Sequence, residues 1–177
     1  SIDPNTLRAL RGYLDVAHRL GILLAQWHSG RARACRLTYR GQMTDKNTRL
    51  LTAAFCAGLL EQALDEEVNI VNAEVLLRER GIELSESSRS TSGVFSSAIS
   101  AEIDCSGTIY RAEGTVFGNN MPRLIRLREH RLEAYLDGNL LIFTHNDVPG
   151  IIGAIGTTLG KHQVNIAQMA VGRLGEA

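Results

Sequence analysis

Long apolar runs are missing from this sequence of 177 residues. A membrane-spanning helix needs about 20 consecutive apolar residues, and no run in the chain approaches that length. The first residues, SIDPNTLRAL, also lack the basic and then apolar layout of a signal peptide. These absences argue against a membrane protein and a secreted protein, and they predict a cytoplasmic location.

Cysteine is also scarce. Cys35, Cys56 and Cys105 lie far apart, are odd in number and never form a CxxC pair. Isolated thiols of this kind are typical of a reducing cytosol and argue against both a disulfide framework and a zinc site. We therefore expect no metal site, and we expect Cys56 and Cys105 to be buried apolar residues.

Net charge is zero, because 19 basic residues balance 19 acidic ones. Proteins that bind nucleic acids normally carry an excess of basic residues, so the balance argues against that class. The sequence also lacks the GxGxxG fingerprint of dinucleotide-binding domains and the P-loop motif. No nucleotide cofactor is therefore expected to bind to this chain.

Helical periodicity dominates the first 80 residues or so. Apolar residues recur at steps of three and four and predict an amphipathic helix over about 7–28. A second helix, apolar nearly all round and therefore buried, is predicted over about 47–65. A third helix would be capped by Asn72 and stopped by Gly81.

Alternating polar and apolar residues indicate strands in the same part of the chain. We predict one strand at 34–41 and, after a polar linker or loop at 85–93, three more. These three cover 95–104, 108–118 and 123–136, with turn sequences between them. The expected fold is therefore α+β, with helices packed on an antiparallel sheet.

A strand–helix–strand unit is predicted after this sheet. The apolar run LLIF, at 140–143, would form its first strand, and VNIAQMAVG, at 164–172, its second. Asp147 can cap the helix between them. Three glycines lie on one side of that helix and would let a sheet or a partner helix approach closely: Gly153, Gly156 and Gly160.

Polar groups gather where the first of these strands meets the helix. His145, Asp147 and, after the helix, Asn165 offer hydrogen-bond donors and acceptors. The free N–H groups at the start of the helix, near Gly150 and Ile151, suit a carboxylate. Asp147 would suit an ammonium group, and the two together describe an α-amino acid. A capped helix without any ligand remains the alternative interpretation.

A run of basic residues lies in PRLIRLREHRLEAY, where four arginines surround His130. Strand alternation predicts that Arg126 and Arg128 point to solvent, whereas Arg123 and Arg131 share the parity of the apolar residues. Arginine suits bidentate contacts with phosphate. A solvated strand face is the usual explanation of such a run and stays open here.

Several of these segments resemble one protein family. HNDVPGIIGAIGTTLGKHQVNIAQM resembles the first half of an ACT domain, as found at the C-terminus of D-3-phosphoglycerate dehydrogenase. GTVFGNNMPRLIRLREHRLEAYLDGNLLIF resembles the end of the intervening domain in the long-chain form of that enzyme, and TYRGQM, LTAAFCAGLLE and VNIVNAEVLLRERGIE resemble its earlier parts. The resemblance covers essentially the whole chain, in the order of the family.

The resemblance implies two domains. Residues 1–137 would be the allosteric substrate- or anion-binding (intervening) domain, with the boundary in the turn DGN. Residues 138–177 would be the first βαβ half of a ferredoxin-like ACT domain, since a complete one would continue beyond Ala177 through two more strands and a helix.

The resemblance also implies a regulatory function. The parent enzyme would oxidise 3-phosphoglycerate with NAD in the first step of serine synthesis, and serine would inhibit it. This chain would hold no catalytic residue and no cofactor. Its partners would be the catalytic domains of the same chain and further copies in a homo-oligomer, joined through the ACT and intervening domains.

Family resemblance assigns two sets of site residues. His145, Asp147 and Asn165 match positions that hydrogen-bond the effector serine between two ACT domains, with Gly150 and Ile151 beside them. In the family, basic residues at the end of the intervening domain bind a phosphate-bearing anion. The matching residues here are Arg123, His130 and Arg131.

Two other functions stay open at this point. The β part of iron–sulfur L-serine dehydratase joins a similar domain to an ACT module, but that family carries SSSHTAG near its start. The corresponding stretch here, RGYLDVAHRLGILLAQ, has nothing like it. The other alternative is a stand-alone amino-acid-sensing module.

Overall fold

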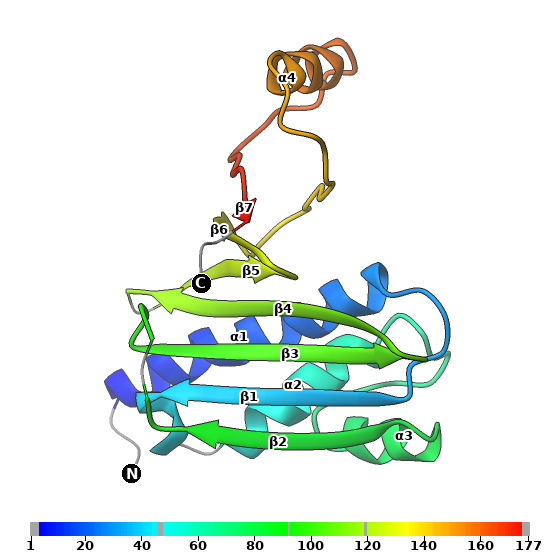
Figure 1. Cartoon of the computed structure of the whole chain (residues 1–177). Helices are drawn as coiled ribbons and strands as arrows, with labels where there is room; N and C mark the ends of the chain where they lie inside the picture. Colours follow the sequence, from blue (N-terminus) through cyan, green and yellow to red (C-terminus); the bar gives the residue numbers. More distant parts are fainter. Residues whose placement is uncertain (1–3, 46–47, 92, 119, 175–177) are drawn as a thin grey trace.

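The computed structural model describes residues 4–45, 48–91, 93–118 and 120–174. Within them a seven-stranded sheet forms the centre of the molecule, and two long helices pack against each other and on one face of the sheet (Figure 1). This is the α+β class that the sequence predicts. In chain order the elements are α1 (Pro4–Trp27), β1 (Ala34–Gly41), the 3-10 helix η1 (Gln42–Asp45), α2 (Thr48–Leu60), α3 (Ala73–Glu79), β2 (Glu83–Arg89), β3 (Ser97–Cys105), β4 (Thr108–Phe117), β5 (Met121–Leu127), β6 (His130–Tyr135), α4 (Ile151–Lys161) and β7 (Arg173–Leu174).

The strand order is β2-β1-β3-β4-β5-β6-β7. The pair formed by β1 and β2 is parallel, and the other pairs are antiparallel. A parallel pair needs a long crossover connection, which α2 and α3 supply between β1 and β2. The prediction of an antiparallel sheet is therefore wrong at this one pair, and the sheet is mixed.

Strand β2 also corrects the loop predicted at 85–93. Its residues pair with β1 from Ala34 opposite Glu83 to Arg40 opposite Arg89. Nearly all of its side chains are exposed, because it lies at the edge of the sheet. A strand in that position needs no apolar face, so a serine-rich sequence like that of a loop is compatible with it. Its backbone hydrogen bonds to β1 make it a strand.

The core lies between the sheet and helices α1 and α2. Ten consecutive residues of α2, from Leu51 to Leu60, are buried, which confirms the buried helix predicted from its all-round apolar character. The two helices approach closely at Gly21 and Gly58: a Cβ atom added at Gly58 would lie 2.0 Å from the carbonyl oxygen of His18. Glycine at this crossing therefore sets the distance between the helices.

All three thiols are buried, which confirms the prediction for Cys56 and Cys105. Burial raises the pKa of Cys35 to about 12, with a smaller contribution from Cys105. Burial likewise raises the pKa of the Cys56 thiol to about 12. Because the thiolate is the reactive form, these groups are inert packing residues at neutral pH.

The segment predicted as one strand at 123–136 forms two strands, β5 and β6, joined by a tight turn. Arg128 in this turn has a φ of 52°. Its guanidinium group lies over the rings of Trp27, at 5.1 Å, and Tyr110, at 5.4 Å. Arg128 is exposed, as strand alternation predicts, and its guanidinium group also ties the turn to the end of α1.

Replacing Arg128 with alanine is expected to lower the free energy of unfolding by about 1 kcal/mol, because each exposed cation–π contact contributes about 0.5–1 kcal/mol. Replacing it with glycine removes the same contacts but relieves the left-handed backbone, so the loss should be smaller. Urea denaturation of both variants tests this, with Glu129→Ala in the same turn as the control. A greater loss for glycine than for alanine would contradict the explanation.

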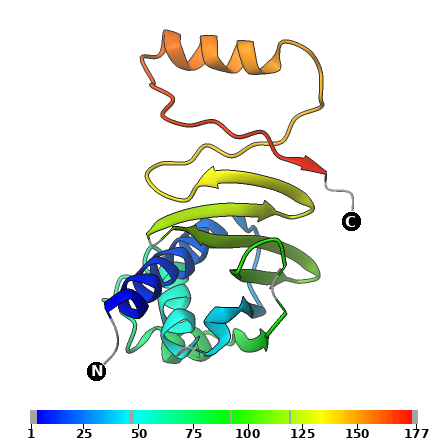
Figure 2. The same cartoon turned by 90° about the vertical axis from the view of Figure 1, so that its left-hand side faces the viewer.

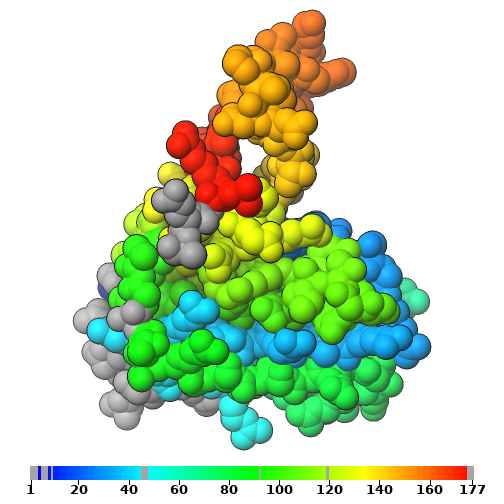
Figure 3. Space-filling model, viewed as in Figure 1, coloured from blue at the N-terminus to red at the C-terminus, as the bar shows by residue number. Residues whose placement is uncertain are grey.

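Residues 138–172 leave the sheet as an extension that carries α4 (Figures 1 and 2). None of the residues of α4 is buried, and the space-filling view shows a narrow projection from the body (Figure 3). The chain returns along β6: the Gln168 side chain accepts a hydrogen bond from the Tyr135 backbone N–H at 3.4 Å. Arg173 and Leu174 then form the short strand β7 beside β6.

The ACT-like detail of the predicted fold is not confirmed. A helix forms where it is expected, but Leu140–Phe143 adopts no strand, and only Arg173–Leu174 is a strand after the helix. Gly150, with a φ of 91°, occupies the N-cap position of α4, which has no side-chain cap. The prediction that Asp147 caps this helix is therefore wrong. The boundary proposed between 1–137 and 138–177 stays a prediction.

Candidate functional site

One face of the sheet is open, because α1 and α2 cover the other (Figures 1 and 2). Residues directly opposite each other on neighbouring strands share a face. Arg36 on β1 lies opposite Glu102 on β3, which lies opposite Arg111 on β4. Further along β4, Glu113 lies opposite Arg126 on β5. Charged side chains thus form rows across four strands of the open face.

Glu113 is the centre of the largest group of charges on this face. Its carboxylate lies 3.0 Å from Nη2 of Arg111, 3.7 Å from Nη2 of Arg40 and 3.9 Å from Nε of Arg126. The Glu113 side chain is only 10% exposed. We call Arg40, Arg111, Arg126 and Glu113 the arginine cluster. Arg126 belongs to this cluster and is a quarter exposed, so the prediction that it points freely to solvent is wrong.

A second carboxylate extends the arginine cluster toward the beginning of β1. Glu102 lies 3.6 Å from Nε of Arg111 and 3.7 Å from Nη1 of Arg36. Arg111 therefore contacts both carboxylates, and its Nε also donates to the Ser100 hydroxyl at 3.3 Å. The sequence analysis did not find this network, because its members belong to four strands that only the sheet brings together.

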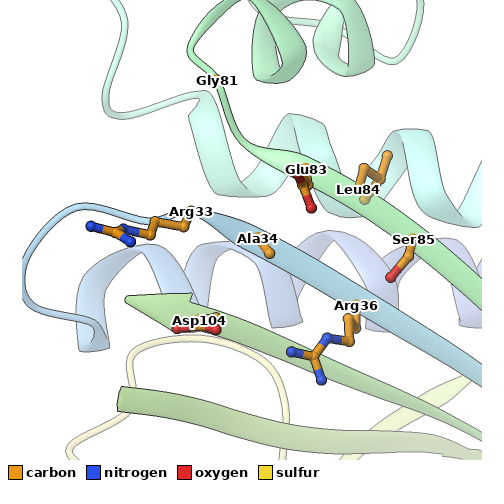
Figure 4. Close-up of a pocket in the computed structure, with 8 residues that line it drawn as sticks. All are labelled: Arg33, Ala34, Arg36, Gly81, Glu83, Leu84, Ser85 and Asp104. Atoms are coloured by element: carbon orange, nitrogen blue, oxygen red, sulfur yellow. The ribbon is translucent and has the colours of Figure 1, made fainter. Parts of the chain in front are cut away.

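A shallow hollow of about 560 Å³ lies at the Arg36 end of the same face (Figure 4). Side chains of both charge signs line it, and Figure 4 shows Arg36 and Ser85 projecting from neighbouring strands. Asp104 is held there by the Gly107 backbone N–H, at 2.8 Å. The lining residues are Arg33, Ala34, Arg36, Gly81, Glu83, Leu84, Ser85 and Asp104.

Arg123 lies in an aromatic environment. Its guanidinium group lies 4.0 Å from the ring centre of Tyr135 and 5.3 Å from that of Phe117. The Phe117 ring stacks on Phe95, at 5.8 Å. Nη1 of Arg123 donates to the backbone oxygen of Pro122 at 2.9 Å. These contacts fix Arg123 in place and leave part of its donor capacity free, since guanidinium has five N–H donors.

The structure does not bring the three predicted anion-binding residues together in one cluster. Arg123 lies opposite Tyr135, whereas Arg131 lies opposite Arg126 and, on its other side, opposite Arg173. The four steps along the strand from residue 131 to residue 135 correspond to about 13 Å. His130 precedes Arg131 on the strand and therefore faces the other side of the sheet. The role of these residues in anion binding stays a prediction.

The predicted effector residues lie on the extension. His145, Asp147, Gly150 and Asn165 are exposed, and Ile151 is half-buried. The His145 ring contacts the backbone oxygen of Asn146 through Nδ1, at 2.8 Å. No hydrogen bond joins these side chains to one another in the part of the chain that the structure describes. The start of α4 has no side-chain cap, so its first N–H groups remain available to a ligand.

Among the residues that the structure describes, no helix has the length and apolar character to cross a membrane. No three His, Cys, Asp or Glu side chains among these residues are placed to hold a metal ion. The polar open face and the start of α4 are the candidate sites.

Comparison with known proteins places the chain in a family. Residues 9–128 match the family model described as the D-3-phosphoglycerate dehydrogenase intervening domain. A D-3-phosphoglycerate dehydrogenase of Archaeoglobus fulgidus is 32% identical over 176 residues, which is 99% of this chain and 33% of the relative. The enzyme of the same name from Synechocystis is 35% identical over 97% of this chain and 31% of the relative.

A third relative, the D-3-phosphoglycerate dehydrogenase of Bacillus subtilis, is 29% identical over 93% of this chain and 31% of the relative. The chain thus spans about a third of the length of the curated relatives that it matches. The family match covers most of α1, all of α2 and α3, and most of the sheet, and the arginine cluster lies within it. With this match over more than half of its length, the chain belongs to the D-3-phosphoglycerate dehydrogenase intervening-domain family.

Proposed function

We propose that this chain is the regulatory region of a D-3-phosphoglycerate dehydrogenase, an enzyme that would oxidise 3-phosphoglycerate with NAD at the start of serine synthesis. The observation that carries the proposal is the family match over residues 9–128, together with relatives that align with nearly the whole chain. The residues of this chain do not fit NAD, because the sequence has no GxGxxG fingerprint. We therefore assign no catalytic step to them.

An assay of the full-length protein tests the parent activity. We expect formation of reduced nicotinamide cofactor that requires both 3-phosphoglycerate and NAD. A second measurement adds serine, which we expect to lower the rate. A full-length protein that shows no oxidation of 3-phosphoglycerate would contradict the proposed parent activity, whereas a serine-insensitive enzyme would contradict only the proposed effector.

The effector proposal rests on the extension. Serine would place its carboxylate near the free N–H groups at Gly150 and Ile151, where a helix N-terminus favours negative charge. Asp147 would accept hydrogen bonds from the ammonium group or the hydroxyl, and His145 and Asn165 would complete the contacts. The exposure of these side chains and the uncapped start of α4 support the proposal.

Oligomer formation through the ACT and intervening domains is part of the same proposal. The extension exposes several large apolar side chains, including Leu141, at 69%, and Val171, at 56%. Exposed apolar surface of this kind is typical of a surface that another chain or segment covers. The serine site would then lie between two such regions, as the family resemblance implies.

The proposal for the anion is that phosphate binds to Arg123 and Arg131, with a weaker contribution from His130. Replacing both arginines with glutamine should abolish phosphate binding, and binding to the parent protein should weaken as salt is raised. Isothermal calorimetry with inorganic phosphate measures the effect. The control is Arg49→Gln with Arg80→Gln, two exposed arginines on the helical side with the same change of charge. Unchanged phosphate binding in the Arg123 and Arg131 double variant would overturn the assignment.

A further inference from the structure

The hollow at the Arg36 end of the open face owes its shape to the register of three strands. Ala34 on β1 lies opposite Glu83 on β2 and, on its other side, opposite Asp104 on β3. Opposite residues share a face of the sheet, so a methyl group lies between two carboxylates (Figure 4). The backbone positions of the two acidic residues are two strand spacings apart, about 9.6 Å. The small side chain of Ala34 therefore leaves space between two longer, negatively charged side chains.

The next row of the same face supplies positive charge and a hydroxyl group. Arg36 lies opposite Ser85 on β2, and both side chains line the hollow. This row is two residues further along β1, which corresponds to about 6.6 Å. Arg33, just before β1, also lines the hollow. The lining thus holds two basic and two acidic side chains, whose charges balance.

Backbone hydrogen bonds hold the three strand ends together around the hollow. The Arg33 N–H donates to the Asp104 backbone oxygen at 2.8 Å, and the Glu83 N–H donates to the Arg33 backbone oxygen at 2.9 Å. One carboxylate oxygen of Asp104 accepts a hydrogen bond from the Gly107 N–H, also at 2.8 Å. The backbone around the hollow is therefore fixed before a ligand enters, which lowers the entropy cost of binding.

Most of the charge that lines the hollow is not neutralised by neighbouring side chains. Among the residues that the structure describes, no oppositely charged group lies within 4 Å of the side chains of Arg33, Glu83 or Asp104. Arg36 is half exposed, and its ion pair with Glu102, at 3.7 Å, is too long for a hydrogen bond. Donors and acceptors thus remain available to a ligand that carries both charges.

We propose that this hollow binds a small zwitterion of the α-amino acid class. The ammonium group of the ligand would lie between the carboxylates of Glu83 and Asp104, and its carboxylate would accept hydrogen bonds from Arg36. Charge-assisted hydrogen bonds are about 2.8 Å long, so an ammonium and a carboxylate joined through one carbon atom can reach both rows. An anion alone would be repelled by the two carboxylates, and a cation alone by the two guanidinium groups.

Backbone amide NMR of the 177-residue chain tests the site. The probe is L-alanine, because it carries both charged groups and no other polar group. We expect the signals of Ala34, Glu83 and Ser85 to shift and to reach saturation. N-acetyl-L-alanine lacks the ammonium group and L-alaninamide lacks the carboxylate, so each should bind about tenfold more weakly or worse. Absence of saturable shifts, or equal binding of either derivative, would overturn the proposal.

Two substitutions each remove one charge from the site. Glu83→Gln and Arg36→Gln should each weaken L-alanine binding by about tenfold, because each removes a charge-assisted hydrogen bond. Glu86→Gln is the matched control on β2: it lies opposite the buried Leu37, so its side chain leaves from the other face of the sheet. It should change the affinity by less than about twofold. Equal losses in Glu83→Gln and Glu86→Gln would overturn the proposal.

A change of size tests the hollow while every charge stays in place. Ala34→Val adds two methyl groups between the carboxylates and should abolish the saturable shifts. Valine is favoured in strands, so we expect β1 to form as before, and circular dichroism checks that the variant is folded. A folded Ala34→Val variant that binds L-alanine as the parent chain does would overturn the proposal.

The same spectra separate this site from the serine site proposed at the start of α4, on which it does not depend. Asp147→Ala should leave the L-alanine shifts of Ala34 and Ser85 unchanged, and a loss of these shifts would overturn the proposal. L-alanine shifts that are confined to residues 145–151 and Asn165 would also overturn it, while leaving the proposed effector site intact.

Discussion

Replacing Gly58 with alanine is expected to lower the free energy of unfolding by about 2–3 kcal/mol, through overpacking at the crossing of α1 and α2. The added Cβ atom would lie 2.0 Å from the carbonyl oxygen of His18 and 2.9 Å from its carbonyl carbon. Backbone atoms cannot rotate away as a flexible side chain can. The helices must therefore separate, although alanine gains about 1 kcal/mol of helix propensity over glycine.

Separation of the helices would loosen the core on both sides of the crossing. Leu20 and Leu24 of α1 and Phe55 of α2 are fully buried there, so a wider spacing opens voids around them. Gly21 makes the matching contact from α1, since its added Cβ atom would lie 2.2 Å from the carbonyl oxygen of Phe55. Gly21→Ala should therefore destabilise the protein to a similar extent.

Urea denaturation, followed by circular dichroism, measures the loss. Gly156→Ala in α4 is the matched control, because it makes the same substitution inside a helix where, apart from the adjacent residues and the nearby backbone of that helix, no atom lies within 4 Å of the added Cβ. It should leave the unfolding of the sheet unchanged. An equal loss of stability in Gly58→Ala and Gly156→Ala would show that the close approach of the helices is not the cause.

Removing the Asp147 side chain is expected to weaken serine binding in the full-length protein by about tenfold to a hundredfold. A hydrogen bond to a charged group contributes about 1.5–3 kcal/mol, and the carboxylate is the proposed partner of the ammonium group. Asn165→Ala removes neutral hydrogen bonds, each worth about 0.5–1.5 kcal/mol, so its effect should be smaller, about tenfold. Because Asp147 does not cap α4, its loss should not destabilise that helix.

Calorimetric titration of serine into the wild-type protein and both variants checks these values. Asp65→Ala is the control, because it removes an exposed carboxylate from the helical side of the molecule. If the site lies between two ACT domains, serine should also strengthen the association of the dimer. The dimer should strengthen serine binding by the same factor. Serine affinities that are equal in all four proteins would mean that the polar residues around the start of α4 form only a turn.

Local sequence patterns were sufficient to predict the elements whose core-facing side chains follow a regular repeat within the element. The alternation in ACRLTYRG predicts a strand at 34–41, and β1 spans Ala34–Gly41. Apolar residues that recur at steps of three and four predict a helix over about 7–28, and α1 spans Pro4–Trp27. In both cases the side chains that face the core recur at the period of the element itself, so the sequence carries the signal.

Elements that depend on a distant partner were predicted less well. Strand β2 resembles a loop in its sequence and is ordered by β1, which lies more than 40 residues earlier. The opposite holds for Leu140–Phe143, whose apolar sequence predicts a strand but which pairs with no strand among the described residues. A strand needs hydrogen bonds from a neighbour, and a window of sequence does not contain that neighbour.

The sequence by itself determined the family resemblance, the α+β class, the buried helix and the inert thiols, because each depends on motifs or on the character of adjacent residues. Only the tertiary structure decided the charge arrangement on the open face. Arg40 and Glu113 are 73 positions apart (113 − 40), yet strand order brings their side chains within 3.7 Å. An irregularity in the pairing between Leu124 and Arg126 also breaks the strict alternation from which the orientations of the arginines between 123 and 131 were predicted. Pairing between strands is a long-range property, and it decides which charges meet.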